Sequence, residues 1–446
     1  MTLQLTRRTV LAAGLSGLAL PPLAATDRAW TSVESAVLFG FPIFEFARTG
    51  IATAGARPGQ PHRFNQLQHA RRLLDHRARQ ITAPNHDTIY SSARLDLTQG
   101  PLLVELPASR EGYFSIAFMN AFTDNFAYSG TRATAGAGGR ALVAGPRWDG
   151  VAPTGVRLVR SATDDVWMLG RFLVDSPDGL TAAHQLQDSL RILEAPDAAP
   201  PSIDAWPAAD PSHFLRVVNI MLARMSLEDP VGRRSRLFAE VGLQPGAIDA
   251  FSGLAPALQA EWLRALPSVV RHLGRGFADL GQTLDGWQSP PAGIGAPGDN
   301  DLVRATVALS GLAALEEVEA TYRRADVDSA GRQLTGAGRY QLRIPAAVPV
   351  GAFWSLTAYE IDESGRLFLV ANPSGRYAIG SHAGELHHEA DGSVRVTLAQ
   401  ADFGGRNWLP TPAGPFALIF RAYLPEPQLL QGRWRLPAVA FLESTT

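Results

Sequence analysis

The sequence contains no cysteine and no lysine, and these absences exclude several kinds of chemistry. Without cysteine there is no disulfide, no thiolate metal site, no iron–sulfur ligation and no cysteine nucleophile. All 40 basic residues are arginine, so Schiff-base lysines, lysine-bound pyridoxal phosphate and P-loop lysines are excluded as well. The reactive groups that remain are carboxylates, histidines, hydroxyls, arginines and amides.

The charge balance and the lengths of the hydrophobic runs limit the kinds of partner that we expect for this protein. The 40 basic and 42 acidic residues give a formal net charge of −2, which argues against a nucleic-acid partner. Beyond the N-terminal segment no apolar run free of charges reaches the ~20 residues of a membrane span, so we expect no stable membrane insertion. A chain of 446 residues suits two or three globular domains at about 100–200 residues each.

Residues 1–25 have the pattern of a bacterial export signal. Arg7 and Arg8 precede an apolar run, Val10–Leu20, and small residues follow at Ala24 and Ala25. A twin-arginine pair, a short apolar core and a small-residue exit are typical of twin-arginine export. We therefore expect a periplasmic or secreted protein. The alternative is an uncleaved N-terminal anchor.

The rest of the chain alternates between sequence patterns typical of helices and patterns typical of strands. Residues 26–200 are predicted to form helices followed by a β-sandwich, residues 201–330 a helical linking segment, and residues 331–446 a second β-sandwich. The predicted fold class is therefore mainly β with α (α+β): two sandwich or jelly-roll-like units joined by helices. Helical periodicity predicts helices at Ser35–Phe46, Phe64–Gln80, Leu180–Leu193 and Asp301–Arg323.

Two short stretches, one in each β region, resemble each other. Val104-Glu105-Leu106-Pro107 and then Tyr113-Phe114-Ser115-Ile116 match Leu342-Arg343-Ile344-Pro345 and then Phe353-Trp354-Ser355-Leu356. Each is a strand closed by proline, a loop, and a strand with two aromatic residues, a serine and an aliphatic residue. A duplicated sandwich and a chance likeness of two hairpins both explain this pattern.

Familiar cofactor motifs are absent or out of context. Gly293–Gly298 matches the spacing of a dinucleotide loop, but no strand precedes it and Pro297 stands where a helix should begin,. The stretch from Asp326 to Gly331 resembles half a calcium loop, but position 337 is alanine where a glutamate ligand is needed,. No metal site and no cofactor are predicted, although carboxylate and histidine ligands for a divalent cation are available.

The densest polar cluster lies between a predicted helix and the first predicted strands, and loops at such places commonly carry functional residues. It runs from Pro84 to Ser91 and includes Asn85, His86, Asp87 and Tyr90. The same residue types also cap turns. A second cluster, Asn407-Trp408-Leu409-Pro410, precedes a C-terminal strand.

At these clusters the chain resembles bacterial exported proteins that pair two families of unknown function, numbered 1254 and 1214. The N-terminal resemblance spans about Phe41 to Leu193, and the C-terminal one about Tyr340 to Val439. It implies two β-sandwich or jelly-roll-like units joined by helices. The motifs that carry it are Pro84–Ser91, Leu95-Asp96-Leu97, Thr123–Tyr128, Gly170-Arg171, Leu186-Gln187-Asp188, Phe353–Leu356, Arg376–Gly380, Asp391-Gly392-Ser393, Asn407–Pro410 and Arg421-Ala422-Tyr423.

The first functional hypothesis is an enzyme acting on a small or oligomeric compound by hydrolase- or lyase-type acid/base chemistry without a redox cofactor. Asp87 is the candidate general acid or base, Tyr90 a proton donor, and His86 a further catalytic candidate. Arg171 and Arg376 are candidate anion clamps. The remaining candidate substrate-binding residues are Asn85, Asp124, Trp354, Asn407 and Trp408.

Two other interpretations stay open. The chain is compatible with a non-catalytic periplasmic ligand-binding or envelope-associated module, because sandwiches present ligand grooves. It is also compatible with a purely structural role for the motif residues, as turn caps and core. A homo-oligomer fits any of the three. Convergence of Asp87, Tyr90, Arg171 and the Asn407-Trp408 pair on one place would favour an enzyme or a binder over the structural interpretation.

Overall fold

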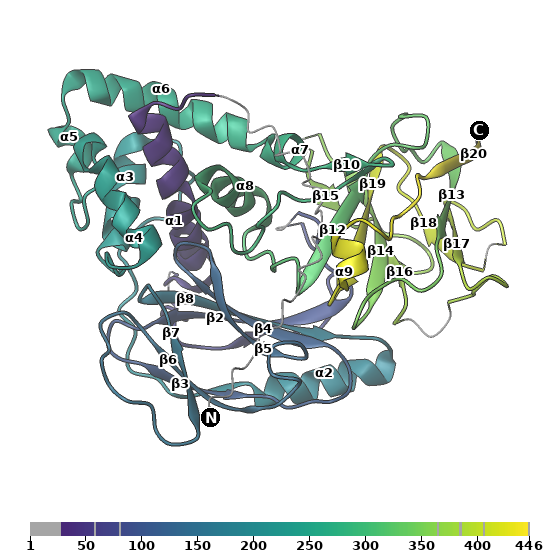
Figure 1. Ribbon diagram of the computed structural model, residues 1–446, viewed down its shortest axis with the longest axis horizontal. Helices are drawn as coiled ribbons and strands as arrows, with labels where there is room; N and C mark the ends of the chain where they lie inside the picture. The colour runs from purple at the N-terminus through teal and green to yellow at the C-terminus, as the bar shows by residue number, and fades with distance from the viewer. Residues whose placement is uncertain are drawn as a thin grey trace, which may run out of the picture.

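The computed structural model describes residues 28–57, 59–79, 82–363, 365–382, 386–404 and 406–444. The predicted export signal lies outside the described residues. Two β units and a helical part can be followed in Figure 1: the N-terminal unit lies at the bottom, the C-terminal unit at the right, and most helices at the upper left. The chain is α+β, with two sandwich-like units joined by helices, as the sequence predicts.

The N-terminal unit consists of two sheets that enclose a hydrophobic core. Leu95, Phe114 and Val104 are among its fully buried members, drawn from both sheets. The first sheet has the order β1 (Gln68–His69), β2 (Thr88–Asp96), β8 (Asp165–Leu173), β4 (Phe114–Asn120), β5 (Asn125–Gly130), and the second the order β7 (Val156–Arg160), β6 (Gly139–Ala144), β3 (Leu102–Leu106), β9 (Arg191–Glu194).

The C-terminal unit is built in the same way around its own core. Its first sheet has the order β10 (Thr283–Leu284), β11 (Trp287–Gln288), β12 (Ala320–Ala325), β19 (Phe416–Tyr423), β14 (Trp354–Ile361), β15 (Leu367–Phe368), with β16 (Ala378–Gly380) also on β14. Its second sheet has the order β18 (Trp408–Pro410), β17 (Val394–Ala399), β13 (Gly338–Ile344), β20 (Ala440–Ser444).

The two units share one topology. The order β2-β8-β4-β5 corresponds to β12-β19-β14-β16, and β7-β6-β3-β9 corresponds to β18-β17-β13-β20. In each second sheet the same pair of strands is parallel, β6 with β7 and β17 with β18, while the other pairs are antiparallel. A helix precedes each last strand, α2 (Pro177–Ser189) and α9 (Pro427–Leu430). A chance likeness of two hairpins would not extend to eight strands in the same order, so the repeated plan suggested by the sequence is real.

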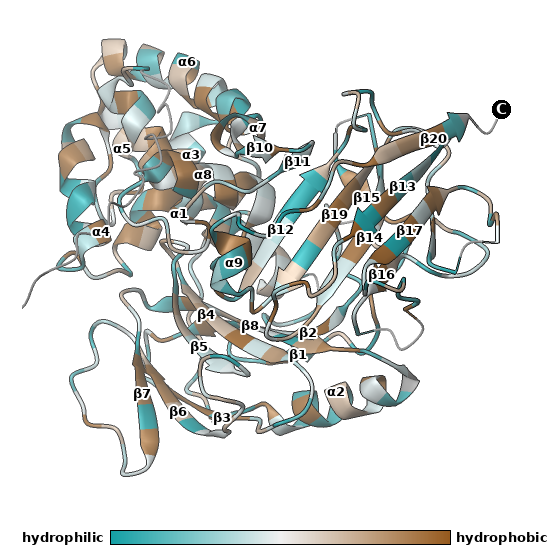
Figure 2. Cartoon of the chain, turned by 45° about the vertical axis from the view of Figure 1, so that its right-hand side comes forward, coloured by the Kyte–Doolittle hydropathy of each residue, from teal (hydrophilic) through white to brown (hydrophobic). Residues whose placement is uncertain are grey.

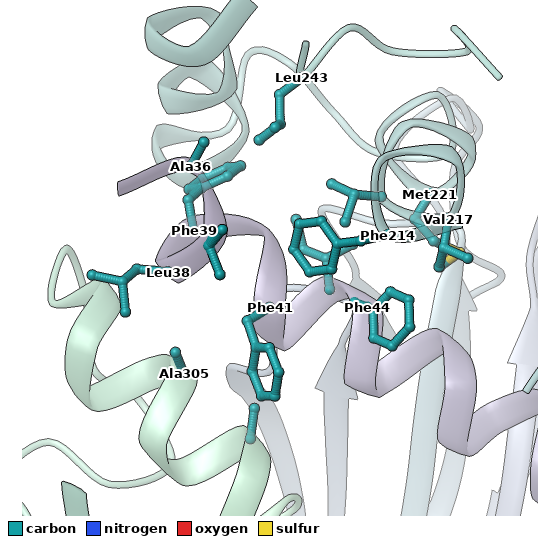
Figure 3. Close-up of a cluster of buried hydrophobic side chains, with 14 of the residues drawn as sticks. Ala36, Leu38, Phe39, Phe41, Phe44, Phe214, Val217, Met221, Leu243 and Ala305 are labelled. Atoms are coloured by element: carbon teal, nitrogen blue, oxygen red, sulfur yellow. The ribbon is translucent and has the colours of Figure 1, made fainter. Parts of the chain in front are cut away.

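The helical part packs around one long apolar helix, α1 (Ser32–Ala54), which begins at a capping box formed by Thr31 and Glu34,. Its length and composition would suit a membrane span, but 72% of the relevant window is buried inside the fold. Figure 3 shows Phe39, Phe41 and Phe44 of α1 directed toward side chains of neighbouring helices. The other helices are α3 (Pro211–Leu222), α4 (Pro230–Arg233), a 3₁₀ helix (Arg234–Val241), α5 (Ala250–Gly253), α6 (Pro256–Leu273), α7 (Gly276–Leu280) and α8 (Asp301–Gly311).

Two predicted helices are wrong. Residues 64–79 are not helical: Gln68 and His69 pair with β2, and the backbone N–H of Ala70 donates to the carbonyl of Tyr90. Edge pairing to β2 thus overrides the helical spacing of the leucines. The predicted helix Asp301–Arg323 ends at Gly311, after which Ala313 has a left-handed φ of 66° and the chain enters β12. The β-forming stretch at Thr321-Tyr322 marks that strand in the sequence.

Candidate functional site

The two units meet through the first sheet of each. One face of β2-β8-β4-β5 covers the core of the N-terminal unit, and the other carries residues that pack against the C-terminal unit. Tyr113, Ala117 and Tyr128 of the N-terminal unit form a buried cluster with Phe353 and Tyr423 of the C-terminal unit. Figure 2 shows the two sheets approaching each other in this region. We call the polar residues at this contact the interdomain cluster. Its members are Asn85, Asp87, Tyr90, Ser115 and Arg171 of the N-terminal unit and Glu319, Tyr322, Ser355, His382, Arg421 and Tyr423 of the C-terminal unit.

A row of three residues is repeated across the two sheets. In the N-terminal unit, Arg171 on β8 stands in register with Tyr90 on β2 and with Ser115 on β4. Residues in register on neighbouring strands share a face of the sheet. In the C-terminal unit, Arg421 on β19 stands in register with Tyr322 on β12 and Ser355 on β14. Each unit therefore contributes the same Tyr–Arg–Ser row.

The two arginines make reciprocal contacts between the units. Arg171 donates from Nη2 to the carbonyl of Ala313, 2.8 Å away, in the segment that leads into the C-terminal unit. Arg421 donates from Nη2 to the carbonyl of Ala83, 3.1 Å away, in the segment that leads into the N-terminal unit. Both alanines have a left-handed backbone, with φ values of 66° and 49°. Each arginine thus fixes the entrance to the other unit.

Asp87 lies at the start of β2 with its side chain fully buried. Asn85 shapes the approach, because its Oδ1 accepts from the backbone N–H of Asp87 at 2.7 Å. The Ser355 hydroxyl donates to Asp87 Oδ2 at 2.7 Å. Asp87 Oδ1 has no hydrogen bond within the described part of the chain, and Nε2 of His382 lies 3.9 Å from it. The carboxylate is therefore held by one oxygen and open at the other.

Glu319 is the counterpart of Asp87, three residues before Tyr322 as Asp87 is three before Tyr90. Val174 donates its backbone N–H to the carbonyl of Asp87, and Leu424 does so to that of Glu319. The Glu319 carboxylate, however, accepts 2.9 Å from the Tyr113 hydroxyl and forms an ion pair with Arg132. Both of its oxygens are used. The same position is a closed structural acid in one half and an open one in the other.

The surrounding phenols stay protonated. Burial is the largest cause that raises the pKa of Tyr423, and the nearby charge of Asp87 raises it further. Burial likewise raises the pKa of Tyr322 and of Tyr359, although Arg171 and Arg421 respectively act in the opposite direction. These hydroxyls are neutral hydrogen-bonding groups near neutral pH.

Of the predicted site residues, Asn85, Asp87, Tyr90 and Arg171 come together in the interdomain cluster. Asn85 donates from Nδ2 to the Tyr423 hydroxyl oxygen at 2.7 Å. The ring of Tyr90 is half-buried, and the guanidinium carbon of Arg171 lies 5.5 Å from its centre. His86 points away, with Nδ1 2.6 Å from the carbonyl oxygen of Leu74.

The other predicted residues hold local structure. Asp124 forms an ion pair with the buried Arg304 of α8 at 2.7 Å, although burial dominates and raises the pKa of Asp124. Trp354 stacks on Phe420 inside the C-terminal core. The remaining three also bond local backbone: Asn407 to His387 and Arg395, Trp408 to Ala399, and Arg376 to Trp408.

Several residues of the interdomain cluster are not among the site residues that the sequence predicts. Ser355 and Arg421 lie in recognised motifs, and their register with Asp87 and Ala83 is visible only in three dimensions. Tyr322 and Glu319 were assigned to a helix. His382 follows a C-terminal motif but belongs to none of those quoted. The repeated spacing of Asp87 to Tyr90 and Glu319 to Tyr322 is a signal that could have found two of them.

Two cavities lie away from this cluster, and no metal-binding group is found among the described residues. Within the described ranges, no group of three or more histidine and carboxylate side chains could hold a metal ion. A cavity of about 10 Å³ lies beside Arg94 under α1, and one of about 110 Å³ lies between His213 and Asp204 on the helical part. The candidate site is thus defined by its unpartnered groups.

Comparison with known families and structures agrees with this architecture. Residues 64–194 match the family described as "Protein of unknown function (DUF1254)" and residues 319–427 match "Protein of unknown function (DUF1214)". The chain therefore pairs the two families in the order that its motifs predict. The first match ends with β9 and the second begins just before β12.

One solved structure extends the likeness to most of the chain. The VPA0106 protein from Vibrio parahaemolyticus has a TM-score of 0.72 and 23% identity, over 92% of this chain and 99% of that protein. The two chains share a fold. An uncharacterized protein from Burkholderia cenocepacia has a TM-score of 0.46 and 13% identity, over 94% of this chain and 91% of that one. No curated protein matches this chain.

Proposed function

We propose that this pair of domains is an exported enzyme that carries out hydrolase- or lyase-type acid/base chemistry on a small molecule, with Asp87 as the proton-transfer group. The proposal of export to the periplasm or beyond rests on Arg7 and Arg8 and the apolar run after them. Replacing both arginines by lysine should leave unprocessed precursor in the cytoplasm, and normal delivery of that variant would contradict export.

The observation that carries the enzymatic proposal is the contrast between Asp87 and Glu319. Both acids occupy the same place in the repeated fold, and both are buried. Glu319 is neutralised by Arg132 and Tyr113, which is what a structural acid needs, because an unpaired buried charge is costly,. Asp87 carries a single hydroxyl donor and one open oxygen. An unsatisfied buried polar group calls for an explanation, and a catalytic role is one of the recognised explanations.

The geometry gives each group a role. Ser355 orients the carboxylate through Oδ2 and leaves Oδ1 to accept or deliver a proton. His382 is 11% exposed in its side chain and faces Oδ1 at 3.9 Å, so a short movement would bring the two into hydrogen-bond distance,. Tyr90 and Tyr322 are half-buried phenols at the edge of the cluster, suited to donate to a substrate oxygen. A metal ion is not needed for any of these roles.

This constellation differs from a serine-hydrolase triad. In a triad the histidine stands between the acid and the hydroxyl. Here the carboxylate stands between Ser355 and His382. We therefore assign proton transfer to Asp87 and an orienting role to Ser355, rather than nucleophilic attack by the serine.

A second function, non-catalytic binding of an acidic small molecule, is favoured by Arg171. Its Nη1 has no hydrogen bond within the described ranges although the side chain is only 7% exposed. A ligand that fills this position would bind whether or not a reaction follows.

The two functions separate in one experiment on Asp87→Asn. The variant protein is screened against ester, lactone and glycoside substrates beside the wild type, with thermal melts of both. For an enzyme, activity should fall by about 10²–10⁴-fold, because proton transfer is lost, while the melting temperature changes little. The matched control is Glu319→Gln, which should lower the melting temperature because it breaks the Arg132 ion pair. Full activity in the Asp87→Asn protein would remove Asp87 from catalysis.

A further inference from the structure

The repeated Tyr–Arg–Ser row makes Arg421 an internal reference for Arg171. Arg421 is 3% exposed and its guanidinium is satisfied by protein groups. Besides Ala83, it donates from Nη1 to the Thr357 hydroxyl at 3.1 Å and from Nη2 to the Tyr359 hydroxyl at 2.7 Å. Thr357 and Tyr359 stand two and four residues after Ser355 on the same strand, so all three share a face of the sheet.

The N-terminal unit lacks these two hydroxyls. The residues two and four positions after Ser115 are Ala117 and Met119, which are 3% and 2% exposed and carry no hydroxyl. Arg171 donates to Ala313 from Nη2, and its Nη1 has no partner within the described residues. An arginine cannot shed its charge in a protein, so the missing partners of Arg171 leave two N–H donors of Nη1 unsatisfied in a buried place.

The charges of the cluster point to the same position. Asp87 acts electrostatically on Arg421, and Glu319 is paired with Arg132. Glu316 and Glu317 are the other carboxylates of this segment; the backbone N–H of Glu316 reaches the Tyr128 hydroxyl, and no ion pair joins either residue to Arg171 among the described residues. Arg171 therefore has no acidic partner within the described part of the chain, and a negatively charged ligand would supply one.

We infer that Arg171 binds the carboxylate of a small-molecule substrate. The carboxylate would take the position that corresponds, in the N-terminal unit, to the one filled by Thr357 and Tyr359 beside Arg421. This inference deepens the proposed function and rests on it only for the word substrate. A carboxylate supplies two acceptor oxygens and one negative charge, which match the two Nη1 donors and the unpaired charge of Arg171,. The half-buried ring of Tyr90, on the β2 side of Arg171, adds a phenol donor and aromatic surface beside the guanidinium.

The test measures binding of benzoate, with benzamide as its neutral isostere and inorganic phosphate as a second anion, by calorimetry on the full chain. Benzoate should bind, and Arg171→Gln should weaken it at least tenfold, since hydrogen bonds to charged groups are strong. Ala117→Thr supplies the hydroxyl of the C-terminal unit while keeping the arginine, and should weaken benzoate severalfold. Arg160→Gln is the control, because Arg160 also donates to a single carbonyl but at an exposed site.

The outcomes are distinct. Equal binding of benzoate and benzamide, tighter binding of phosphate than of benzoate, or benzoate binding that survives both Arg171→Gln and Ala117→Thr would each overturn the inference. If Arg171→Gln does not fold, the Ala117→Thr result decides. An Asp87→Asn protein that keeps its activity contradicts the proposed function but leaves the inference standing wherever benzoate binding still depends on Arg171.

Discussion

Unequal hydrogen bonding of the two equivalent arginines predicts unequal costs when each is replaced by methionine. Methionine keeps an unbranched, flexible side chain that matches the aliphatic stem of arginine, but it lacks the guanidinium with its charge and donors. Arg421 makes three hydrogen bonds, to Ala83, Thr357 and Tyr359. Arg171 makes one, to Ala313.

The structure sets the magnitudes. Arg421→Met leaves three buried acceptors without their donor and strips Asp87 of a nearby cation, so we expect a loss of about 3–5 kcal/mol in the free energy of unfolding, the cost of breaking a buried charge network. Arg171→Met loses one charge-assisted hydrogen bond of about 1.5–3 kcal/mol but removes an unsatisfied donor group of about 1–3 kcal/mol. Its net effect should therefore lie between a gain of about 1.5 kcal/mol and a loss of about 2 kcal/mol. Arg421→Met should be the less stable variant by at least about 1 kcal/mol.

Urea unfolding of both variants and the wild type measures this difference, with tryptophan fluorescence as the signal from the nine tryptophans. Equal denaturant slopes for the three proteins would show that the shift in midpoint reports stability. If Arg171→Met loses as much stability as Arg421→Met, then Nη1 of Arg171 is satisfied in solution by a protein group, and the reasoning from the repeated row fails.

Two further changes test other parts of the structure. Burial is the main cause that raises the pKa of Asp164 from 3.8 to about 6. Because the folded state holds the proton more tightly than the unfolded chain, ionising Asp164 lowers the stability progressively as pH rises from about 4 to 6. The melting temperature of Asp164→Asn relative to wild type should therefore rise over that window, whereas a constant difference would contradict the shifted pKa. Gly130 ends β5 with a φ of 139°, and a Cβ there would lie 2.3 Å from the Phe114 carbonyl oxygen. Gly130→Ala should therefore lower the free energy of unfolding by about 2 kcal/mol or more. The loss should be clearly larger than for Gly155→Ala, whose Cβ meets nothing within 4 Å.

The sequence predicts the architecture well because local patterns carry it. The likeness between Leu106-Pro107 with Tyr113–Ile116 and Ile344-Pro345 with Phe353–Leu356 reports two equivalent crossings from the second sheet to the first, β3 to β4 and β13 to β14. β3 and β13 alternate because one of their faces is buried, whereas β4 and most of β14 are buried on both faces,. The two wrong helices lie where edge pairing and a left-handed residue override spacing, at β1 and after Gly311.

The candidate site is less accessible to sequence reasoning, because its partners are distant in the chain. Asp87 and Ser355 are bonded across 268 residues, and Arg421 and Ala83 across 338. Asn407 and Trp408 look equally functional as a motif, yet their side chains donate to backbone carbonyls of the neighbouring strand β17. Residue type alone does not separate a polar group that secures a loop from one that faces another unit. Which acid has an open oxygen depends on Arg132 and Tyr113, which only the folded chain brings to Glu319.

The reciprocal arginine contacts have a consequence for how such a chain can change over time. Two identical subunits related by a two-fold axis would make the Arg171–Ala313 and Arg421–Ala83 contacts as one contact seen twice,. In such a dimer every substitution appears in both halves, so a residue could not be structural on one side and reactive on the other. Joining the halves in a single polypeptide lifts that constraint. Thr357 and Tyr359 can seal one arginine while Ala117 and Met119 leave the other open, and Glu319 can stay paired while Asp87 is released. Asymmetry of function is thus a property that the covalent link, rather than either half, makes possible.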